Sequence, residues 1–247
     1  MAVTYHLPVS RLPAAVLLDL DDTILDDTGC VDECWADACA RAEQLVTGIR
    51  AAELQKTIQE HASWWWSDRE RNRTGRLDLR KTTGSIVAEA FRRLGHDDAE
   101  AAFSVANHYR DLREERARLH EGAIETIEWL RRGGVRLGMM TNGAGPSQRA
   151  KIERFKLASH FDHIVIEGEF GVGKPDRRVF ASLLETLRVE PAQTWAVGDN
   201  LEADVLGAMA LGIYGVWVDR SGRGVRDGIA RQPDRIIGAL RDLITTG

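Results

Sequence analysis

Short apolar, β-prone runs alternate with amphipathic helical segments, and this alternation constrains the fold of the chain more than any other feature. The first strand is expected at Ala14–Leu18, and the alternation resumes after Gly122. The later strands are expected at Val135–Met140, His163–Glu167, Thr194–Val197 and Ile213–Val218, and the helices at Ala123–Arg132, Gln148–Phe155, Arg177–Leu187 and Glu202–Leu211. Repeated strand–helix units of this kind predict an α/β fold with a parallel sheet and right-handed crossovers.

The stretch from about Gly29 to Leu119 interrupts this alternation. It is rich in Ala, Glu, Arg and Gln and has few strand signals, which favours amphipathic helices. Four helices are expected there, at Val31–Val46, Ala51–Trp66, Thr83–Leu94 and Asp98–Arg118. Because the stretch directly follows the first strand of the sheet, we interpret it as an inserted helical lid domain.

The composition excludes several classes of function. With 43% hydrophobic and 29% charged residues among 247, the chain is typical of a globular protein with a sizeable core. The net charge of −5, from 33 basic and 38 acidic residues, offers no basic surface for nucleic acid. No apolar run approaches the ~20 residues that span a bilayer, and Met1–Pro13 lacks the pattern of a secretory signal. We therefore expect a cytoplasmic protein with no nucleic-acid or membrane partner.

The three cysteines, Cys30, Cys34 and Cys39, lie close together in the sequence. Helical spacing places Cys39 off the face that Cys30 and Cys34 share, which argues against a common metal or redox site. We interpret them as reduced packing residues, as is usual in the cytosol.

The run Val16–Thr23 carries the strongest chemical signal. It delivers two carboxylates, Asp19 and Asp21, at the end of an apolar strand, and a hydroxyl at Thr23. Successive strand residues alternate between faces, so the two carboxylates would share a side if the chain stayed extended. Like charges this close repel, and a bound divalent cation is the usual reason to tolerate them. The carboxyl edge of an open α/β sheet is also where ligands bind.

Polar groups follow the other expected strands in a similar way. Thr141-Asn142-Gly143 can donate to anionic oxygens, Lys174 before Pro175 can place a point charge on a phosphate, and Asp199 and Asp204 bracket a helix start. Each alone has a plain structural explanation, as a turn, a helix start or a cap. In chain order, these groups are an acid, a hydroxyl, a base and a second acid, and each follows a strand of the same sheet. Together they predict an active site.

These four motifs resemble those of the haloacid dehalogenase-like hydrolase superfamily, in the branch with a helical cap inserted after the first motif. The resemblance covers nearly the whole chain. It implies a Rossmann-like catalytic core, residues 1–28 and 119–247, with a helical cap domain at residues 29–118.

Carried over by position, the resemblance implies a role for each motif residue. Asp19 is the nucleophile that attacks phosphorus and forms an aspartyl-phosphate, and Asp21 is the general acid and then the general base. Thr141 and the Asn142 amide hold phosphate oxygens, and Lys174 neutralises charge between the nucleophile and the phosphate.

The resemblance also implies a Mg²⁺ site. Its ligands are a carboxylate oxygen of Asp19, the backbone carbonyl of Asp21 and the carboxylate of Asp199. Asp204 supports this ligand set, and Thr23 fixes the loop after the first strand.

The expected function is a Mg²⁺-dependent phosphatase that hydrolyses a small phosphorylated metabolite of the sugar phosphate or nucleotide class. Its partner is a small-molecule phosphate ester, and the protein is expected to be a monomer or a homodimer. An acidic Asp21 argues against a 2-haloacid dehalogenase or a phosphonatase. A phosphomutase of the β-phosphoglucomutase type remains an alternative, although Gly usually stands where Asp22 stands here. A noncatalytic, receiver-like phospho-accepting module is a further alternative, but receivers carry no helical insert of this size.

The helical insert contains an unusual run, Trp64-Trp65-Trp66, followed by a charged segment from Ser67 to Arg76. Consecutive tryptophans cannot share one face of a helix, so at least one is expected to face the core domain or solvent. We favour packing between the helical insert and the core domain, with the charged segment as a solvated loop, over stacking on a leaving group.

Overall fold

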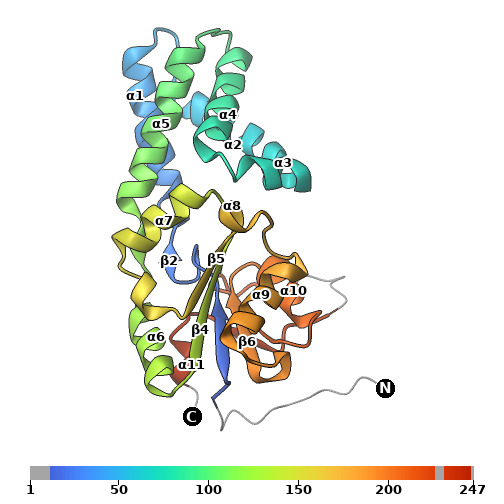
Figure 1. Cartoon of the computed structure of the whole chain (residues 1–247). Coiled ribbons are helices and arrows are strands. Elements are labelled where there is room, and N and C mark those ends of the chain that lie inside the picture. The colour runs from blue at the N-terminus through green and yellow to red at the C-terminus, as the bar shows by residue number, and fades with distance from the viewer. Residues whose placement is uncertain (1–11, 226–230, 246–247) are drawn as a thin grey trace. The chain divides into compact units, whose positions relative to one another are not determined.

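The computed structural model describes residues 12–225 and 231–245 and divides into two compact units (Figure 1). The core unit comprises Met1–Asp26 and Leu119–Gly247, and the helical unit comprises Asp27–Arg118. Most of the N-terminal stretch Met1–Pro13 lies outside the described residues. Among the helices that the structure describes, none combines the length and the apolar character needed to cross a membrane.

The core unit is built on a six-stranded sheet in the order β5-β4-β1-β6-β7-β8. The strands are β1 (Ala15–Leu18), β4 (Arg136–Thr141), β5 (His163–Ile166), β6 (Thr194–Gly198), β7 (Tyr214–Val218) and β8 (Arg235–Ile237). All five neighbouring pairs are parallel, and Leu18 is in register with Met139 on one side and Val197 on the other. The structure thus confirms the predicted α/β fold with a parallel, Rossmann-like sheet. β2 (Leu25–Asp26) and β3 (Arg118–Leu119) form a separate two-stranded sheet.

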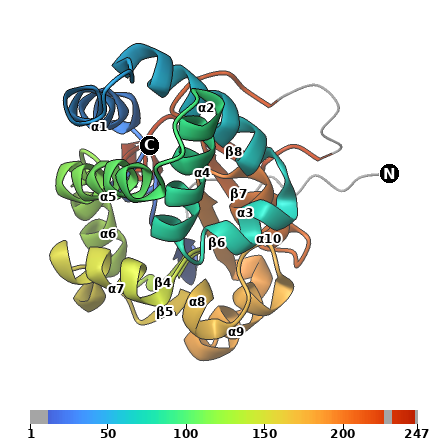
Figure 2. The same cartoon turned by 90° about the horizontal axis from the view of Figure 1, so that it is seen from above.

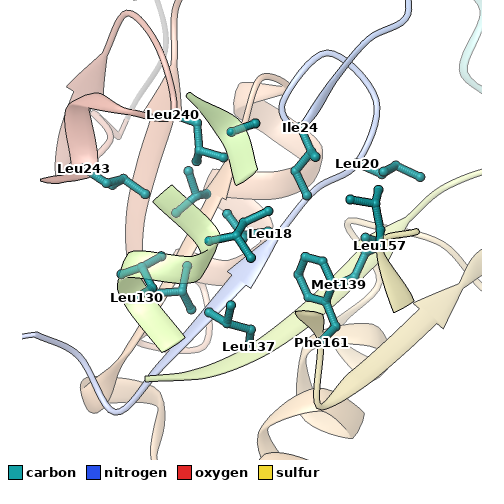
Figure 3. Close-up of a cluster of buried hydrophobic side chains, with 14 of the residues drawn as sticks. Leu18, Leu20, Ile24, Leu130, Leu137, Met139, Leu157, Phe161, Leu240 and Leu243 are labelled. Carbon is teal, nitrogen blue, oxygen red and sulfur yellow. The ribbon is translucent and has the colours of Figure 1, made fainter. Parts of the chain in front are cut away.

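Both faces of the sheet are covered, as parallel sheets require. Val16 and Leu18 of β1 join the cluster that includes Leu130 of α6 (Ala123–Arg132), and Figure 3 shows this packing around Leu18. Leu17, on the opposite face, joins the cluster that includes Phe180 of α9 (Arg177–Leu187). The alternation of β1 residues between two buried clusters explains why this strand is apolar throughout.

Further helices complete the core unit. They are α7 (Gly145–Arg154), α8 (Glu167–Phe170), α10 (Gly207–Met209), α11 (Asp242–Thr245) and the short turns η1 (Ala158–His160), η2 (Pro191–Gln193) and η3 (Leu201–Leu206). The helix expected at Glu202–Leu211 is instead the π-helical turn η3, capped by the Asn200 side chain, followed by α10. The strand β8 was not predicted, because three residues are too few for a periodic signal.

The helical unit contains α1 (Val31–Leu45), α2 (Ala51–Ser67), α3 (Arg69–Gly75), α4 (Leu79–Arg93) and α5 (Ala99–Arg116). Figure 2 shows α1 and α5 side by side, and the ring of Trp35 on α1 stacks on that of Tyr109 on α5 with centroids 3.5 Å apart. Cys34 and Cys39 are buried in this core and Cys30 packs against it, all as free thiols, which agrees with their interpretation as packing residues.

The tryptophan run lies at the end of α2. Trp64 is 52% exposed, whereas Trp65 and Trp66 pack against the core of the helical unit. The expectation of a solvated loop after this run was wrong, because Asp68 caps a further helix, α3, by accepting a hydrogen bond from the Arg71 amide. The guanidinium of Arg71 stacks on the Trp64 ring at 3.8 Å, so the charged segment is ordered by the aromatic run.

Candidate active site

The polar ends of β1, β4 and β6 meet at one edge of the sheet. These three strands are neighbours, with β1 in the middle. The chain adds β4 and β5 on one side of β1 and then crosses to add β6, β7 and β8 on the other. Such a topological switch point leaves a crevice at the carboxyl ends of the strands, where ligands bind in open α/β sheets. Asp19, Thr141 and Asp199 stand at these ends.

Lys174 is the centre of the hydrogen-bond network at this edge. Its ammonium donates to Asp19 Oδ1 at 2.5 Å and to the Met140 carbonyl at 2.8 Å, and it pairs with Asp204 Oδ1 at 2.8 Å. An ammonium has three hydrogens, and three partners satisfy them. Burial lowers the pKa of Lys174, but the two carboxylates outweigh it and raise the pKa above its usual value. The lysine therefore stays charged.

Asp19 is buried and incompletely satisfied. Among the residues that the structure describes, no group hydrogen-bonds to its Oδ2. Burial raises the pKa of Asp19, with Lys174 acting against this and Asp204 and Asp199 reinforcing it. Burial and the neighbouring Asp204 likewise raise the pKa of Asp199 to about 7. The site thus holds more carboxylates than the ammonium of Lys174 neutralises.

This excess of carboxylate fits a divalent cation. Asp19, Asp199 and Asp204 each contribute one carboxylate oxygen, and these three oxygens lie within 4.8 Å of one another. Asp204 is engaged by Lys174 through Oδ1 and by the Asn200 amide through Oδ2 at 3.0 Å. Asp19 and Asp199 are therefore the better side-chain candidates for ligands, and hard cations such as Mg²⁺ prefer such oxygens.

Backbone and side-chain contacts hold the two acidic loops together. The Thr23 hydroxyl is fully buried and accepts a hydrogen bond from the Asp199 amide at 3.1 Å. The Trp217 indole donates to the Asp199 carbonyl at 2.7 Å. Thr23 therefore links the loop after β1 to the loop after β6.

The Asn142 side chain has structural partners. Its Nδ2 donates to the Lys174 carbonyl at 2.9 Å, and its Oδ1 accepts from the Lys174 amide at 2.8 Å. The next residue, Gly143, donates its amide to the buried Glu167 carboxylate at 2.9 Å. The reciprocal pairing between the Asn142 side chain and the Lys174 backbone holds Lys174 against the end of β4. The sequence interpretation did not include Glu167.

Asp21 turns its carboxylate to helix α7. Gln148 Nε2 donates to Asp21 Oδ2 at 2.8 Å and also to the Thr141 hydroxyl, and Lys151 Nζ lies 2.7 Å from Asp21 Oδ1. The sequence interpretation missed Gln148 and Lys151. Their spacing of three on a helix that begins at Gly145, two residues after Thr141-Asn142-Gly143, is the signal that could have identified them.

The arrangement separates two chemical environments. Asp19 is buried beside a fixed positive charge, that of Lys174, which suits a nucleophile that must approach an anion. Asp21 lies beside the hydroxyl of Thr141 and is partly exposed, which suits proton exchange. Of the sequence-predicted site residues, Asp19, Lys174, Asp199 and Asp204 form one cluster, and Asp21 joins Thr141 through Gln148.

Comparisons with known proteins place the chain in a family. The sequence pattern of haloacid dehalogenase-like hydrolases matches residues 13–212. The phosphoserine phosphatase of Thermus thermophilus is 34% identical over 245 residues, covering 92% of this chain and 96% of the relative. A glyceraldehyde 3-phosphate phosphatase of Methanopyrus kandleri is 30% identical over 211 residues, covering 83% and 84%. The crystal structure of a HAD phosphatase from Thermococcus onnurineus superposes with a TM-score of 0.60 at 25% identity, covering 93% of this chain and 95% of that one. This chain therefore belongs to the haloacid dehalogenase-like hydrolases.

Proposed function

We propose that this hydrolase is a Mg²⁺-dependent phosphatase that forms an aspartyl-phosphate at Asp19. The observation that carries the proposal is the state of the Asp19 carboxylate. One oxygen is held by Lys174 at 2.5 Å, and the other has no hydrogen-bond partner among the described residues. A buried carboxylate with one such oxygen beside a cation is suited to attack an electrophile.

In the first step, an Asp19 oxygen forms a bond to phosphorus and the bond to the leaving-group oxygen breaks. The Asp21 carboxyl donates its proton to that oxygen. The Thr141 hydroxyl holds the transferred phosphoryl group, and the charge of Lys174 offsets the repulsion between the two anions. Phosphoryl transfer depends mainly on such alignment and charge stabilisation.

In the second step, the Asp21 carboxylate takes a proton from water. The water oxygen bonds to phosphorus, the bond to Asp19 breaks, and inorganic phosphate leaves. One residue can serve as acid and then as base because the first step leaves it deprotonated.

A magnesium ion would be held by the Asp19 and Asp199 carboxylates and the Asp21 backbone carbonyl. When bound, it neutralises the excess carboxylate charge and polarises the phosphoryl oxygens. Asp204 would position Lys174 and the loop after β6, because its oxygens contact Lys174 and the Asn200 amide.

The substrate class is a small phosphorylated metabolite. Two relatives that match most of this chain are named for phosphoserine and for glyceraldehyde 3-phosphate, and both compounds are small phosphate monoesters. We include sugar phosphates and nucleotides in the class, since the catalytic residues would contact only the phosphoryl group and the leaving-group oxygen, which all phosphate monoesters share. The acidic Asp21 favours hydrolysis of phosphate esters over dehalogenation, because an ester leaving group needs a proton.

Phosphate release from a panel of phosphorylated metabolites, with Mg²⁺ and with a chelator, tests the proposal. We expect turnover only with the metal, and no turnover in Asp19→Asn, which should stay folded. Rapid-quench mass spectrometry should find a phosphoryl adduct on Asp19. Incorporation of labelled solvent oxygen into phosphate in the first turnover, with no adduct, would contradict the mechanism.

A further inference from the structure

The catalytic motifs leave two residues of helix α7 unexplained. Gln148 is 3% exposed, and the Lys151 side chain is 12% exposed. Burying an amide or an ammonium is unfavourable unless each finds a partner. Both side chains find their partner in the carboxylate of Asp21, which lies 127 positions from Gln148 and 130 from Lys151 in the sequence.

The contacts hold the Asp21 carboxylate at both oxygens. Lys151 Nζ lies 2.7 Å from Oδ1, and Gln148 Nε2 lies 2.8 Å from Oδ2. A carboxylate bonded at only one oxygen can rotate, whereas one bonded at both is held in one plane. The orientation of the Asp21 carboxylate is therefore set by α7, whereas Asp21 contacts its own loop through the backbone bridge to Leu25.

Gln148 also determines how the Thr141 hydroxyl is used. The same Nε2 donates to Thr141 Oγ1, so this oxygen is an acceptor in that contact. A hydroxyl has one hydrogen to donate, and accepting from Gln148 leaves that hydrogen for another acceptor, such as an anionic oxygen. One amide nitrogen thus links the expected acid–base residue to the expected phosphate-binding hydroxyl.

The local sequence explains how α7 reaches Asp21. The helix begins at Gly145, directly after β4 and its turn, with Pro146 in its first turn. Gln148 and Lys151 are three positions apart and lie on one face. Arg149, on another face, pairs with the exposed Glu169 at 2.6 Å, so charge on α7 does not by itself direct a side chain to the site.

We propose that Lys151 and Gln148 are positioning residues for phosphoryl transfer: Lys151 orients the Asp21 carboxyl toward the leaving-group oxygen, and Gln148 aligns Asp21 with the Thr141 hydroxyl. The inference rests on the proposed phosphatase function. Its specific consequence concerns the proton that Asp21 delivers as the bond between phosphorus and the leaving-group oxygen breaks. Substrates that need this proton should depend on Lys151, and substrates that do not should depend on it little.

Two esters of similar size separate these cases. p-Nitrophenolate is a stable anion and leaves without a proton, whereas the alkoxide of benzyl phosphate must be protonated. In Lys151→Met, we expect kcat/KM for benzyl phosphate to fall by roughly 10- to 100-fold, within the range of general acid catalysis. For p-nitrophenyl phosphate, we expect a fall of less than about 3-fold. Lys151→Arg should restore most of the loss, and Gln148→Leu should lower kcat/KM for both esters.

Lys156→Met is the matched control, because it makes the same change at an exposed lysine just past α7 and should leave both values unchanged. Equal losses on the two esters, or no loss, in Lys151→Met would overturn the role of Lys151. Unchanged kcat/KM values in Gln148→Leu would overturn the role of Gln148. If Lys151→Met does not fold, Lys151→Gln gives the same comparison. If the unaltered enzyme releases phosphate neither from these two esters nor from any metabolite of the panel, the proposed function fails, and the inference fails with it.

Discussion

Charged residues are used differently at the sheet edge of the core unit and on the exposed helix faces of the helical unit. At the sheet edge, Lys174 and Asp204 are almost wholly buried, and the three partners of Lys174 come from distant parts of the chain. In the helical unit, Arg80 pairs with Asp111 at 2.8 Å, and both side chains are about half exposed. Burying charges of the first kind carries a large desolvation free energy, whereas exposed pairs of the second kind change the free energy of folding little.

The difference indicates where function lies. A buried group of carboxylates with a single ammonium is unfavourable for folding alone, so it is expected where chemistry or a cation requires it. Exposed pairs on helices add solubility and little stability. Four predictions test this contrast between the two regions.

The largest effect is expected for Lys174→Met. The change leaves Asp19 and Asp204 without their common cation, so an approaching phosphate is no longer attracted. We expect kcat to fall by roughly 10²- to 10³-fold, the range for losing one transition-state charge contact. Steady-state kinetics measures this, with circular dichroism as a check on folding. Near-normal kcat would show that this buried pair has only a structural role.

A smaller effect at the same edge is expected for Gly198→Ala. An added Cβ would lie 2.2 Å from Asp204 Oδ2, and Asp204 cannot withdraw without leaving Lys174 and the Asn200 amide. We expect the free energy of unfolding to fall by about 1–3 kcal/mol, as for other overpacked sites. Urea denaturation measures it. In the control, Gly238→Ala, the new Cβ meets only Asp242 Oδ2 at 3.5 Å, and the two variants should differ clearly.

In the helical unit, His61 should make stability depend on pH. Burial and the neighbouring Arg93 lower the pKa of His61 below its usual value, and Arg93 Nη2 lies 3.1 Å from its Nδ1. Because the unfolded chain takes up a proton more readily than the folded one, stability should fall as pH drops through about 6.5. Thermal unfolding of the intact protein, measured as a function of pH, should show a smaller loss of stability at low pH in His61→Gln than in the unaltered protein. Parallel curves for the two proteins would contradict this.

The smallest effect is expected for the exposed pair Arg80–Asp111. A double-mutant cycle with Arg80→Ala and Asp111→Ala should give a coupling free energy below about 1 kcal/mol. Added salt should reduce it further. A coupling as large as that of a buried pair would remove the contrast between the two regions.

The helices and strands could be predicted from the local sequence pattern wherever they are long and periodic. The helix Arg177–Leu187 was predicted with its observed bounds, and the sheet strands after Gly122 were predicted within two residues, except β8. Helix α3 was missed because its seven residues are all polar or glycine, so it has no apolar face. Its stability comes instead from the Asp68 cap and from Arg71 on Trp64.

By itself, the sequence determined which chemical groups stand at the ends of the strands, because strand ends and motif residues are adjacent in the chain. Only the tertiary structure decided how those groups pair. Lys174 meets Asp19 across 155 positions, and Lys151 meets Asp21 across 130. Such contacts depend on the order of strands in the sheet and on the direction in which α7 leaves it. No local propensity encodes either, because both are set by packing of the whole core.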